Sequence, residues 1–461
     1  MGAGCCKNRI AEQPNVKKIL VKPKDSKTAQ QNGHVSVKDD DDYIEKVVCH
    51  ENDIGENEMK NFEIGDTKVL VIKQNGISAI GAKCSHYGAY LSMGALGDGR
   101  VRCPWHGACF NIKTGDIEDF PGQDSLPCYQ VKISEAGQVV VRAKKSALKL
   151  YKRQPVKIGR DLLNQQTFVI IGGGPSGTIC VENLRSNGFG GRIVFVCKEN
   201  YLPYDRVKVS KAMDAEIDSI LLRPQSFYDN YDIEVILGVA ATGLNSETRE
   251  ISLSNGEKLK YDKVYIATGS SPSKLDVPGI DLKNIVTLRD IDESKYIIER
   301  INKDTHIVVL GVSFTGMEAA AFCVKKVAKV TVIGRDSIPF RHSFGAEIGG
   351  AILKFFKANK VEFEMKSGIK SCIGNEKGEI ESVELIDGKI LKCDLFILAC
   401  GSYLNTEFLK ESGININQNG SIDTDEYLQT NIENIYVGGD IANSPIYMTG
   451  KNENIGHYPL A

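Results

Sequence analysis

The chain has 461 residues, enough for about three domains of ordinary size. Its 42% hydrophobic content and 45 glycines indicate a globular α/β protein and exclude a disordered one. A net charge of −2 without a basic stripe disfavours nucleic acid as a partner, and no stretch of eighteen apolar residues is present to span a membrane.

Residues 1–42 are polar, lack periodicity and predict a flexible tail. Gly2, Cys5 and Cys6 fit a myristoylation and palmitoylation signal in part, because Cys6 stands where Ser or Thr is usual. Two acyl chains would hold the protein stably at a membrane. The 13 scattered cysteines indicate a reducing compartment. We therefore expect a cytoplasmic protein with membrane association through acylation; a mitochondrial presequence and a plain disordered tail are the alternatives.

Residues 43–145 contain short β-rich runs, which predict a small all-β domain. The turns between these runs carry strong signals, Asn75-Gly76 and Asp98-Gly99. Two loops of this domain each combine one cysteine with one histidine, in the segments Cys84-Ser85-His86 and Cys103-Pro104-Trp105-His106.

Two thiolates and two imidazoles are the ligand set of a Rieske [2Fe–2S] centre, in which two histidines replace two cysteines on one iron. Zinc is the alternative, since the same four side chains suit a tetrahedral ion. Zinc fingers, however, pair Cys with Cys and His with His, whereas each loop here offers one of each. We predict a [2Fe–2S] cluster ligated by Cys84, His86, Cys103 and His106.

Residues 146–166 form a basic linker, and from residue 167 onward apolar strands alternate with helical patterns, as in doubly wound α/β domains. The first strand runs directly into a glycine-rich turn and a helix. Such a turn binds the pyrophosphate of a dinucleotide at the helix N-terminus, and an acid after the next strand binds the ribose. A glycine-rich packing turn is the alternative. The candidate cofactor-binding residues of this motif are Gly172, Gly174, Pro175, Ser176, Gly177 and Glu199.

A second copy of the motif follows, with Gly311, Ser313, Gly316 and Glu318 as candidate residues for a nicotinamide nucleotide. Ser313 replaces the middle glycine, and a small side chain is tolerable there. The next strand ends at Arg335, where an NAD site usually has an acid. An arginine at this place can accommodate the 2′-phosphate of NADPH. The alternative is that Arg335 is simply solvent-exposed, so the sequence does not decide between NADH and NADPH as the nucleotide.

Near the end of the chain, a short strand leads into Gly438-Gly439-Asp440. An acid at the carboxyl end of a strand lies where ligands bind in open α/β sheets. Asp440 is therefore predicted to hydrogen-bond the ribityl or pyrophosphate part of a flavin, with an ordinary turn acid as the alternative.

Together these motifs resemble the FAD-dependent pyridine nucleotide oxidoreductases related to ferredoxin reductases and apoptosis-inducing factor, in the branch that carries a Rieske domain. The resemblance covers residues 43–461 and also rests on the segments 202–211 and 267–269. It implies that Glu199, Arg206, Lys211 and Asp440 contact FAD. By the same resemblance, two further residues lie close to the flavin, Ala241 and Arg289.

The resemblance also implies a multidomain fold, in which the small all-β Rieske domain precedes two α/β dinucleotide-binding domains. The FAD-binding domain is expected in two parts, residues 167–290 and 406–461, around an NAD(P)-binding domain at residues 291–405. Members of the family have a further C-terminal domain after the segment that matches residue 461. We therefore expect this chain to be truncated and to bind FAD less tightly.

These parts predict an FAD-dependent NAD(P)H oxidoreductase. A nicotinamide nucleotide delivers two electrons at once and a Rieske centre takes one at a time, so FAD converts between them. The motifs do not identify the final electron acceptor, and no catalytic side chain is predicted. The alternative is a redox-responsive pro-apoptotic or signalling protein whose cofactors serve conformation rather than turnover.

Overall fold

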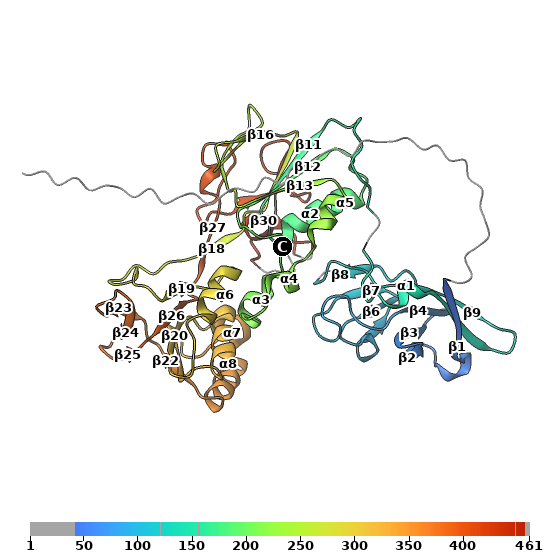
Figure 1. The fold of residues 1–461 in the computed structure, drawn as a ribbon, viewed down its shortest axis with the longest axis horizontal. Helices are drawn as coiled ribbons and strands as arrows, with labels where there is room; N and C mark the ends of the chain where they lie inside the picture. The colour runs from blue at the N-terminus through green and yellow to red at the C-terminus, as the bar shows by residue number, and fades with distance from the viewer. Residues whose placement is uncertain (1–41, 120, 155–156, 448, 457–461) are drawn as a thin grey trace, which may run out of the picture.

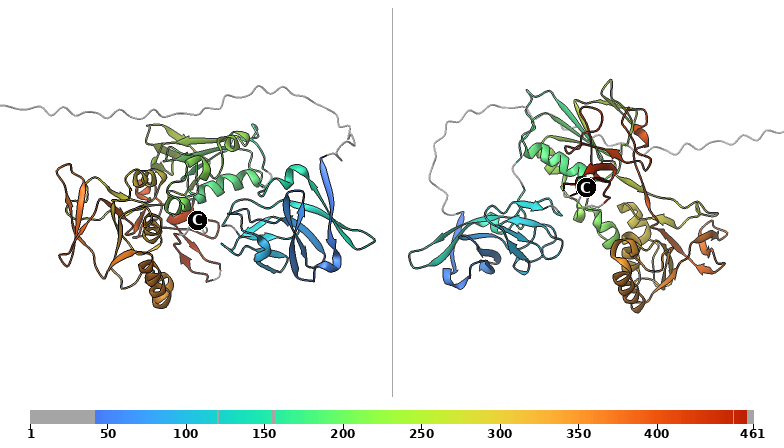
Figure 2. Two further views of the ribbon diagram at one scale, coloured as in Figure 1. Left: turned by 60° about the horizontal axis from the view of Figure 1, so that its bottom comes forward. Right: turned by 180° about the vertical axis from the view of Figure 1, so that it is seen from behind.

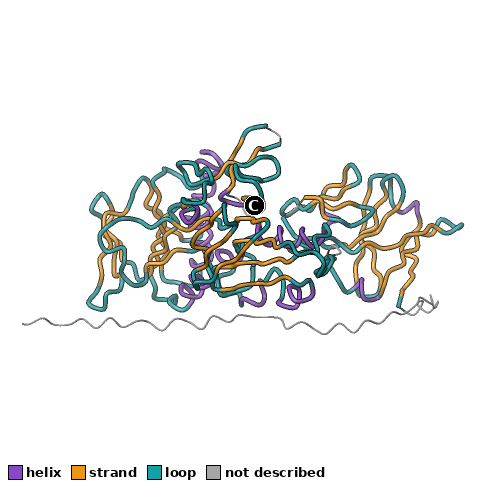
Figure 3. The backbone as a smooth tube through the Cα atoms, turned by 90° about the horizontal axis from the view of Figure 1, so that it is seen from above, coloured by secondary structure: helices purple, strands orange, loops and turns teal. Residues whose placement is uncertain are grey.

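The computed structural model describes residues 42–119, 121–154, 157–447 and 449–456. The acylation candidates Gly2, Cys5 and Cys6 therefore lie outside the described residues. Strands gather in three bodies along the long axis of the molecule (Figure 3). In chain order we name these bodies the β-domain, the first α/β domain and the second α/β domain. None of the helices in this described part is both long and apolar enough to cross a membrane.

The β-domain consists of a six-stranded antiparallel sheet and a smaller four-stranded one. The turns expected from the sequence are present: Asn75 and Gly76 both have positive φ, as do Asp98 and Gly99. The six-stranded sheet has the order β1 (Tyr43–His50), β10 (Gln138–Lys144), β9 (Cys128–Ile133), β4 (Ile77–Gly81), β3 (Thr67–Lys73) and β2 (Glu58–Ile64). The four-stranded sheet has the order β5 (Ala95–Gly97), β6 (Arg100–Arg102), β7 (Cys109–Asn111) and β8 (Ile117–Asp119).

Strand β3 has four consecutive buried residues, because both of its faces are covered. Leu70 and Ile72 pack into the core beneath the cysteine–histidine loops. Val69 and Val71 pack on the other face, together with Leu148 of α1 (Lys145–Leu148). The β-domain thus extends a few residues into the segment that the sequence assigns to the linker.

The first α/β domain has a five-stranded parallel sheet with helices α2 (Pro175–Ser186) and α5 (Gln225–Asn230) against it. Its last strand comes from the C-terminal segment of the chain. The sheet order is β13 (Ile233–Leu237), β12 (Arg192–Cys197), β11 (Thr167–Ile171), β17 (Lys263–Ile266) and β29 (Ile435–Val437). A three-stranded sheet covers the other face, with β14 (Ala241–Asn245), β15 (Glu250–Leu253) and β16 (Lys258–Lys260).

The second α/β domain repeats this plan. Ile307 and Val309 of its central strand pack against α7 (Phe314–Cys323), whereas Val308 and Leu310 pack under the three-stranded sheet. The parallel order is β19 (Ile285–Thr287), β26 (Leu395–Leu398), β20 (His306–Leu310), β21 (Lys329–Gly334) and β22 (Val361–Met365). The remaining elements are α6 (Ile291–Ile298), α8 (Arg341–Ala358), β23 (Ile369–Gly374), β24 (Ile380–Leu385) and β25 (Ile390–Lys392).

Strand β19 corrects the domain boundary that the sequence places between residues 290 and 291. This strand belongs to the second sheet, where it pairs with β26, so the second domain begins earlier in the chain. The chain crosses between the two α/β domains through an antiparallel pair, β18 (Ser270–Pro272) with β27 (Ser402–Leu404). A three-residue strand that pairs only with distant residues has no periodicity for a sequence pattern to reveal.

Two short helices, α3 (Val207–Lys211) and α4 (Ile217–Ile220), lie where the three domains approach one another (Figures 1 and 2). The C-terminal part completes the first α/β domain with β28 (Ile422–Asp423), β30 (Ala442–Pro445) and β31 (Asn452–Glu453). Single 3₁₀ turns occur at η1 (Glu51–Asp53), η2 (Leu91–Met93), η3 (Glu407–Leu409) and η4 (Gly439–Ile441).

Candidate functional site

The two cysteine–histidine loops of the β-domain have the same backbone turn. The Cys84 N–H donates to the Ala89 carbonyl and the Cys103 N–H donates to the Ala108 carbonyl, each at 2.8 Å. Gly88 and Gly107 occupy equivalent places, with φ of 80° and 79°, a left-handed conformation that favours glycine. Two matching turns therefore present two thiols and two imidazoles side by side.

The four predicted ligands are brought together in pairs. The Cys84 and Cys103 thiols are within hydrogen-bond reach of each other, and burial raises the pKa of Cys84 to about 12. The imidazole centroids of His86 and His106 lie 5.0 Å apart. Burial, and after it the neighbouring His106, lower the pKa of His86 to about 4, so this ring is neutral, which is the metal-binding form.

The site also has an unsatisfied buried atom. The Nδ1 of His86 is buried without a hydrogen-bond partner, which a metal ion would supply. Backbone N–H groups of residues 86 and 87 donate to the Cys84 sulfur, as expected around an iron–sulfur cluster. No three His, Cys, Asp or Glu side chains in the described ranges gather around a single point. Although each loop carries one cysteine and one histidine, the fold brings the two thiols together and the two imidazoles together. Such an arrangement suits a cluster with two cysteines on one iron and two histidines on the other.

The first glycine-rich turn fits a dinucleotide pyrophosphate. A Cβ on Gly172 would lie 2.1 Å from the Ala267 carbonyl oxygen, and one on Gly177 would lie 2.0 Å from the Gly172 carbonyl oxygen. A Cβ on Gly174, in contrast, would meet nothing within 4 Å. Helix α2 begins at Pro175 without a side-chain cap, so its N–H groups are left for a ligand. The space beside Gly174 is therefore the place for a phosphate group.

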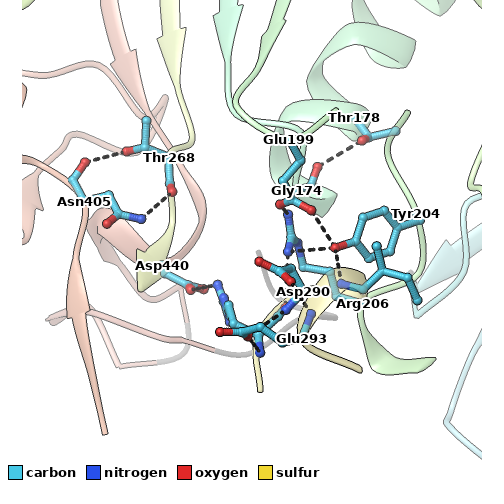
Figure 4. A network of polar contacts seen from close by, with 12 residues as sticks. Gly174, Thr178, Glu199, Tyr204, Arg206, Thr268, Asp290, Glu293, Asn405 and Asp440 are labelled. Carbon is cyan, nitrogen blue, oxygen red and sulfur yellow. Dashed lines mark hydrogen bonds and ion pairs between the residues drawn. The ribbon is translucent and has the colours of Figure 1, made fainter. Parts of the chain in front are cut away.

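Glu199, which the sequence predicts to bind ribose, lies in a half-buried polar network (Figure 4). It forms an ion pair with Arg206 and accepts a hydrogen bond of 2.6 Å from the Tyr204 hydroxyl. Burial alone would lower the pKa of Arg206, but Glu199 together with Tyr204 and Asp290 raises it above the usual value. The Gly238 N–H donates to the Glu199 carbonyl at 2.9 Å, and that segment leads directly to Ala241. Arg206 thus contacts Glu199 directly, and Ala241 begins β14 three residues after Gly238.

Asp440 lies on the opposite side of this network (Figure 4). It is placed by the turn η4 after β29, accepts a hydrogen bond of 2.7 Å from Ser270, and pairs with Arg289 at 3.2 Å. The Arg206 guanidinium donates to the Arg289 carbonyl at 3.4 Å, which connects the two sides. Four of the residues assigned to the flavin by resemblance, Glu199, Arg206, Arg289 and Asp440, thus lie around one region at the carboxyl ends of the first sheet.

The second glycine-rich turn matches the first. A Cβ on Gly311 would lie 2.1 Å from the Ala399 carbonyl oxygen, and one on Gly316 would lie 2.2 Å from the Gly311 carbonyl oxygen. Ser313 stands at the N-cap of α7 without capping it, so this helix end is also left for a phosphate. Arg335 is exposed just after β21.

Glu318 and Lys211 connect the two α/β domains. The Lys211 ammonium on α3 lies 2.6 Å from the Glu318 carboxylate on α7, and Ser210 donates to the same carboxylate at 2.5 Å. The sequence assigns Lys211 to the flavin and Glu318 to the nicotinamide nucleotide. Their ion pair places the two predicted cofactor sites next to each other.

Sequence reasoning missed three residues that hold this region together. The Tyr204 hydroxyl links Glu199 to the first turn of α6, where it accepts from the Ile291 N–H at 3.2 Å. Thr268 and Asn405 hydrogen-bond each other across the two crossing strands, at 2.8 and 3.0 Å (Figure 4). The segments 202–211 and 267–269 of the resemblance contain Tyr204 and Thr268 but assign neither a role, and no pattern distinguishes Asn405.

Known proteins share both parts of the chain. The Rieske [2Fe-2S] domain model matches residues 45–130, and the pyridine nucleotide-disulphide oxidoreductase model matches residues 166–459. Apoptosis-inducing factor 3 of Homo sapiens is 38% identical over 427 residues, which cover 91% of this chain and 70% of that protein. Rhodocoxin reductase of Rhodococcus erythropolis is 30% identical over 283 residues, covering 61% of this chain and 66% of the reductase.

A solved structure agrees with these matches. The ferredoxin reductase for the CYP199A2 system from Rhodopseudomonas palustris superposes with a TM-score of 0.60 at 27% identity, covering 63% of this chain and 72% of that one. The cofactors implied by the two family models are FAD, a nicotinamide nucleotide and a [2Fe–2S] cluster. The chain belongs to the pyridine nucleotide-disulphide oxidoreductase family, as an oxidoreductase that carries a Rieske domain.

Proposed function

We propose that this protein passes electrons from NAD(P)H through FAD to its Rieske cluster, and from the cluster to a one-electron acceptor of the ferredoxin type. The observation that carries the proposal is the position of α3. One end of this helix pairs with the second α/β domain through Lys211, and the residue before Arg206 at its other end, Asp205, contacts Tyr87 next to the ligand His86. The residues predicted for all three cofactors therefore approach one another at α3.

One turnover moves two electrons from one NAD(P)H to two molecules of a one-electron acceptor, and one proton is released with NAD(P)⁺. FAD supplies the conversion from a two-electron to a one-electron carrier. The protein's own residues bind the cofactors and orient them. Glu199 and the helix α2 N-terminus hold the dinucleotide, while Asp440 and Arg289 position its ribityl side.

The alternative is a redox-responsive pro-apoptotic or signalling protein, and the name of the relative apoptosis-inducing factor 3 favours it. Steady-state assays with ferricyanide and with a cytochrome separate the two functions. An oxidoreductase gives continued turnover of NAD(P)H with both acceptors. A protein that uses its cofactors for conformation gives a single slow reduction of the flavin, and that result would contradict the proposed function.

We also propose that Arg335 binds the 2′-phosphate of NADPH. Bidentate contacts between arginine and phosphate are charge-assisted and strong. The replacement Arg335→Ala is expected to weaken the binding of NADPH by about 10- to 100-fold, which is the effect of losing a hydrogen bond to a charged group. The binding of NADH is expected to stay unchanged. Measured KM values for the two nucleotides check this, with Arg341→Ala as an exposed arginine control on α8. Equal effects on both nucleotides would show that Arg335 is an ordinary surface residue.

Cytoplasmic localisation, with membrane association through acyl groups on Gly2, Cys5 and Cys6, is proposed from the sequence alone. Mitochondrial import is the alternative. Mass spectrometry of the N-terminal peptide from expressing eukaryotic cells distinguishes them. A myristoyl group on Gly2 supports the proposal, and a processed N-terminus that lacks this segment contradicts it.

A further inference from the structure

The β-domain meets the first α/β domain through a buried ion-pair network. Arg223 lies between two carboxylates, Asp124 of the β-domain and Glu182 of α2. Its guanidinium donates to the two oxygens of Asp124 at 2.8 and 3.2 Å and to those of Glu182 at 2.9 and 3.1 Å. All three residues are buried, with Asp124 and Arg223 each only 4% exposed. We call this set the Asp124–Arg223–Glu182 clamp.

Lysines of the linker reinforce the clamp. The Lys157 ammonium lies 3.4 Å from the Glu182 carboxylate and its side chain is fully buried. The Lys152 ammonium lies 3.9 Å from the Asp124 carboxylate. Burial alone would lower the pKa of Arg223, but its two carboxylate partners raise that pKa well above the usual value. Buried charges are tolerated when they are paired, whereas removal of one partner is strongly destabilising.

The clamp is connected to the cluster site. The Ser85 hydroxyl, between the ligands Cys84 and His86, donates to the Asp124 carbonyl at 2.5 Å. Tyr87, the residue after His86, stacks on the His86 ring with the two ring centroids 3.9 Å apart. His106, in contrast, is exposed, and so is its neighbour Trp105. The His106 ring also lies edge-on to Tyr87, with centroids 5.6 Å apart. His86 is therefore the less exposed of the two predicted histidine ligands and stacks directly on Tyr87, whereas His106 is open to solvent.

Tyr87 makes the direct contact between the cluster loop and the flavin-side residues. Its hydroxyl donates to the Asp205 carboxylate, and the Lys208 ammonium of α3 lies 4.2 Å from the centroid of its ring. Asp205 in turn accepts from the Val207 N–H at 3.1 Å and is followed by Arg206 of the Glu199 network. A continuous series of packed and hydrogen-bonded groups thus runs from His86 to the residues assigned to FAD.

We propose that the Asp124–Arg223–Glu182 clamp docks the Rieske domain in a fixed place on the FAD-binding domain, and that electrons enter the cluster through the Tyr87–Asp205 contact on its His86 side. This inference rests on the proposed function and names the surface that serves it. Each NAD(P)H requires two single-electron transfers across this contact. Two molecules of a one-electron acceptor such as ferricyanide take one electron each, and one proton is released with NAD(P)⁺. Docking keeps the distance between the flavin site and the cluster site short and constant for both electron transfers.

The variant Asp124→Asn tests the clamp, because it removes the interdomain charge and leaves the Arg223–Glu182 pair in place. Asp119→Asn is the matched control, since Asp119 pairs with Arg102 within the β-domain at 2.5 Å. Trypsin cleavage after Lys152 and Lys157, followed by mass spectrometry, reports docking without any enzyme activity. We expect cleavage to be about tenfold faster in Asp124→Asn, since proteolysis follows the population of the open form, and unchanged in Asp119→Asn.

Stopped-flow reduction by NAD(P)H tests electron entry in the same proteins. In Asp124→Asn we expect flavin reduction at the wild-type rate and cluster reduction about tenfold slower, because misplaced redox partners react slowly. Tyr87→Leu is expected to slow cluster reduction by a similar factor while the linker stays protected. Dithionite must reduce the cluster fully in every variant. If Asp124→Asn lacks the cluster, Arg223→Lys tests the same contact, because lysine cannot form the bidentate pair.

The outcomes separate this inference from the proposed function. Wild-type cleavage and wild-type cluster reduction in Asp124→Asn would overturn the clamp. Wild-type cluster reduction in Tyr87→Leu would overturn Tyr87 as the entry point. If NAD(P)H reduces the flavin but not the cluster of the unaltered protein, the proposed function itself fails, and the proteolysis result alone decides whether the domains are docked.

Discussion

The replacement His106→Ala is expected to abolish the electron paramagnetic resonance signal of the reduced cluster. His106 is one of two imidazoles that must complete the coordination of one iron, and no other histidine among the described residues lies beside it except His86. Iron and acid-labile sulfide should fall from two of each per chain, the composition of a [2Fe–2S] centre, to a small fraction of that amount. Metal analysis after anaerobic purification, together with the spectrum, measures this loss.

Cys128→Ser is the matched control for this experiment. Cys128 lies in the same domain, but its thiol is exposed and donates to the Lys113 carbonyl at 2.9 Å, away from the two loops. The sequence also predicts that Cys109 and Cys128 are not ligands. Cys128→Ser should therefore keep both irons and an unchanged signal. Stoichiometric zinc in the unaltered protein, or an intact cluster in His106→Ala, would contradict the ligand assignment.

The replacement Asp440→Ala is expected to release FAD while the Rieske signal persists. Asp440 is held by Ser270 and Arg289 at the carboxyl ends of the first sheet, where it is predicted to accept hydrogen bonds from the flavin. Loss of one or two charge-assisted hydrogen bonds weakens binding by about 10- to 100-fold. The β-domain has its own two hydrophobic cores, so its cluster should survive. Absorbance and released-flavin fluorescence after gel filtration measure the occupancy.

Asp423→Ala provides the comparison, because Asp423 lies in the same C-terminal part but is exposed and accepts hydrogen bonds from Asn417 and Asn443. This variant should retain FAD fully. Retention of FAD at wild-type occupancy in Asp440→Ala would show that the carboxylate is a turn acid and not a flavin ligand.

Features set by local chemistry could be predicted from the sequence. The Asn75-Gly76 turn and the two glycine-rich loops depend on residues that are adjacent in the chain, since Gly172 and Gly311 require a positive φ that other residues rarely adopt. The same holds for Cys84 and Cys103, whose turns repeat each other. Such positions combine an unusual conformation with an unusual residue, and a pattern can therefore find them.

Features set by distant contacts could not be predicted in this way. Arg223 and Asp124 are 99 residues apart, and nothing beside either in the sequence marks it as buried. Tyr204 joins Glu199 to α6 only after the two α/β domains have folded together. Strand β19 is defined by its pairing with β26 rather than by its own composition. Charged and aromatic residues of this kind acquire their roles from tertiary structure alone.

The central claim is that NAD(P)H reduces the Rieske cluster through FAD within one chain. Anaerobic mixing of the purified protein with one equivalent of NAD(P)H, followed by freeze-quenching and electron paramagnetic resonance, tests it most directly. We predict that flavin bleaching is followed by the signal of the reduced cluster, at the same rate over a range of protein concentrations because the transfer is intramolecular. A bleached flavin beside a cluster that stays oxidised, yet is reduced by dithionite, would contradict the claim.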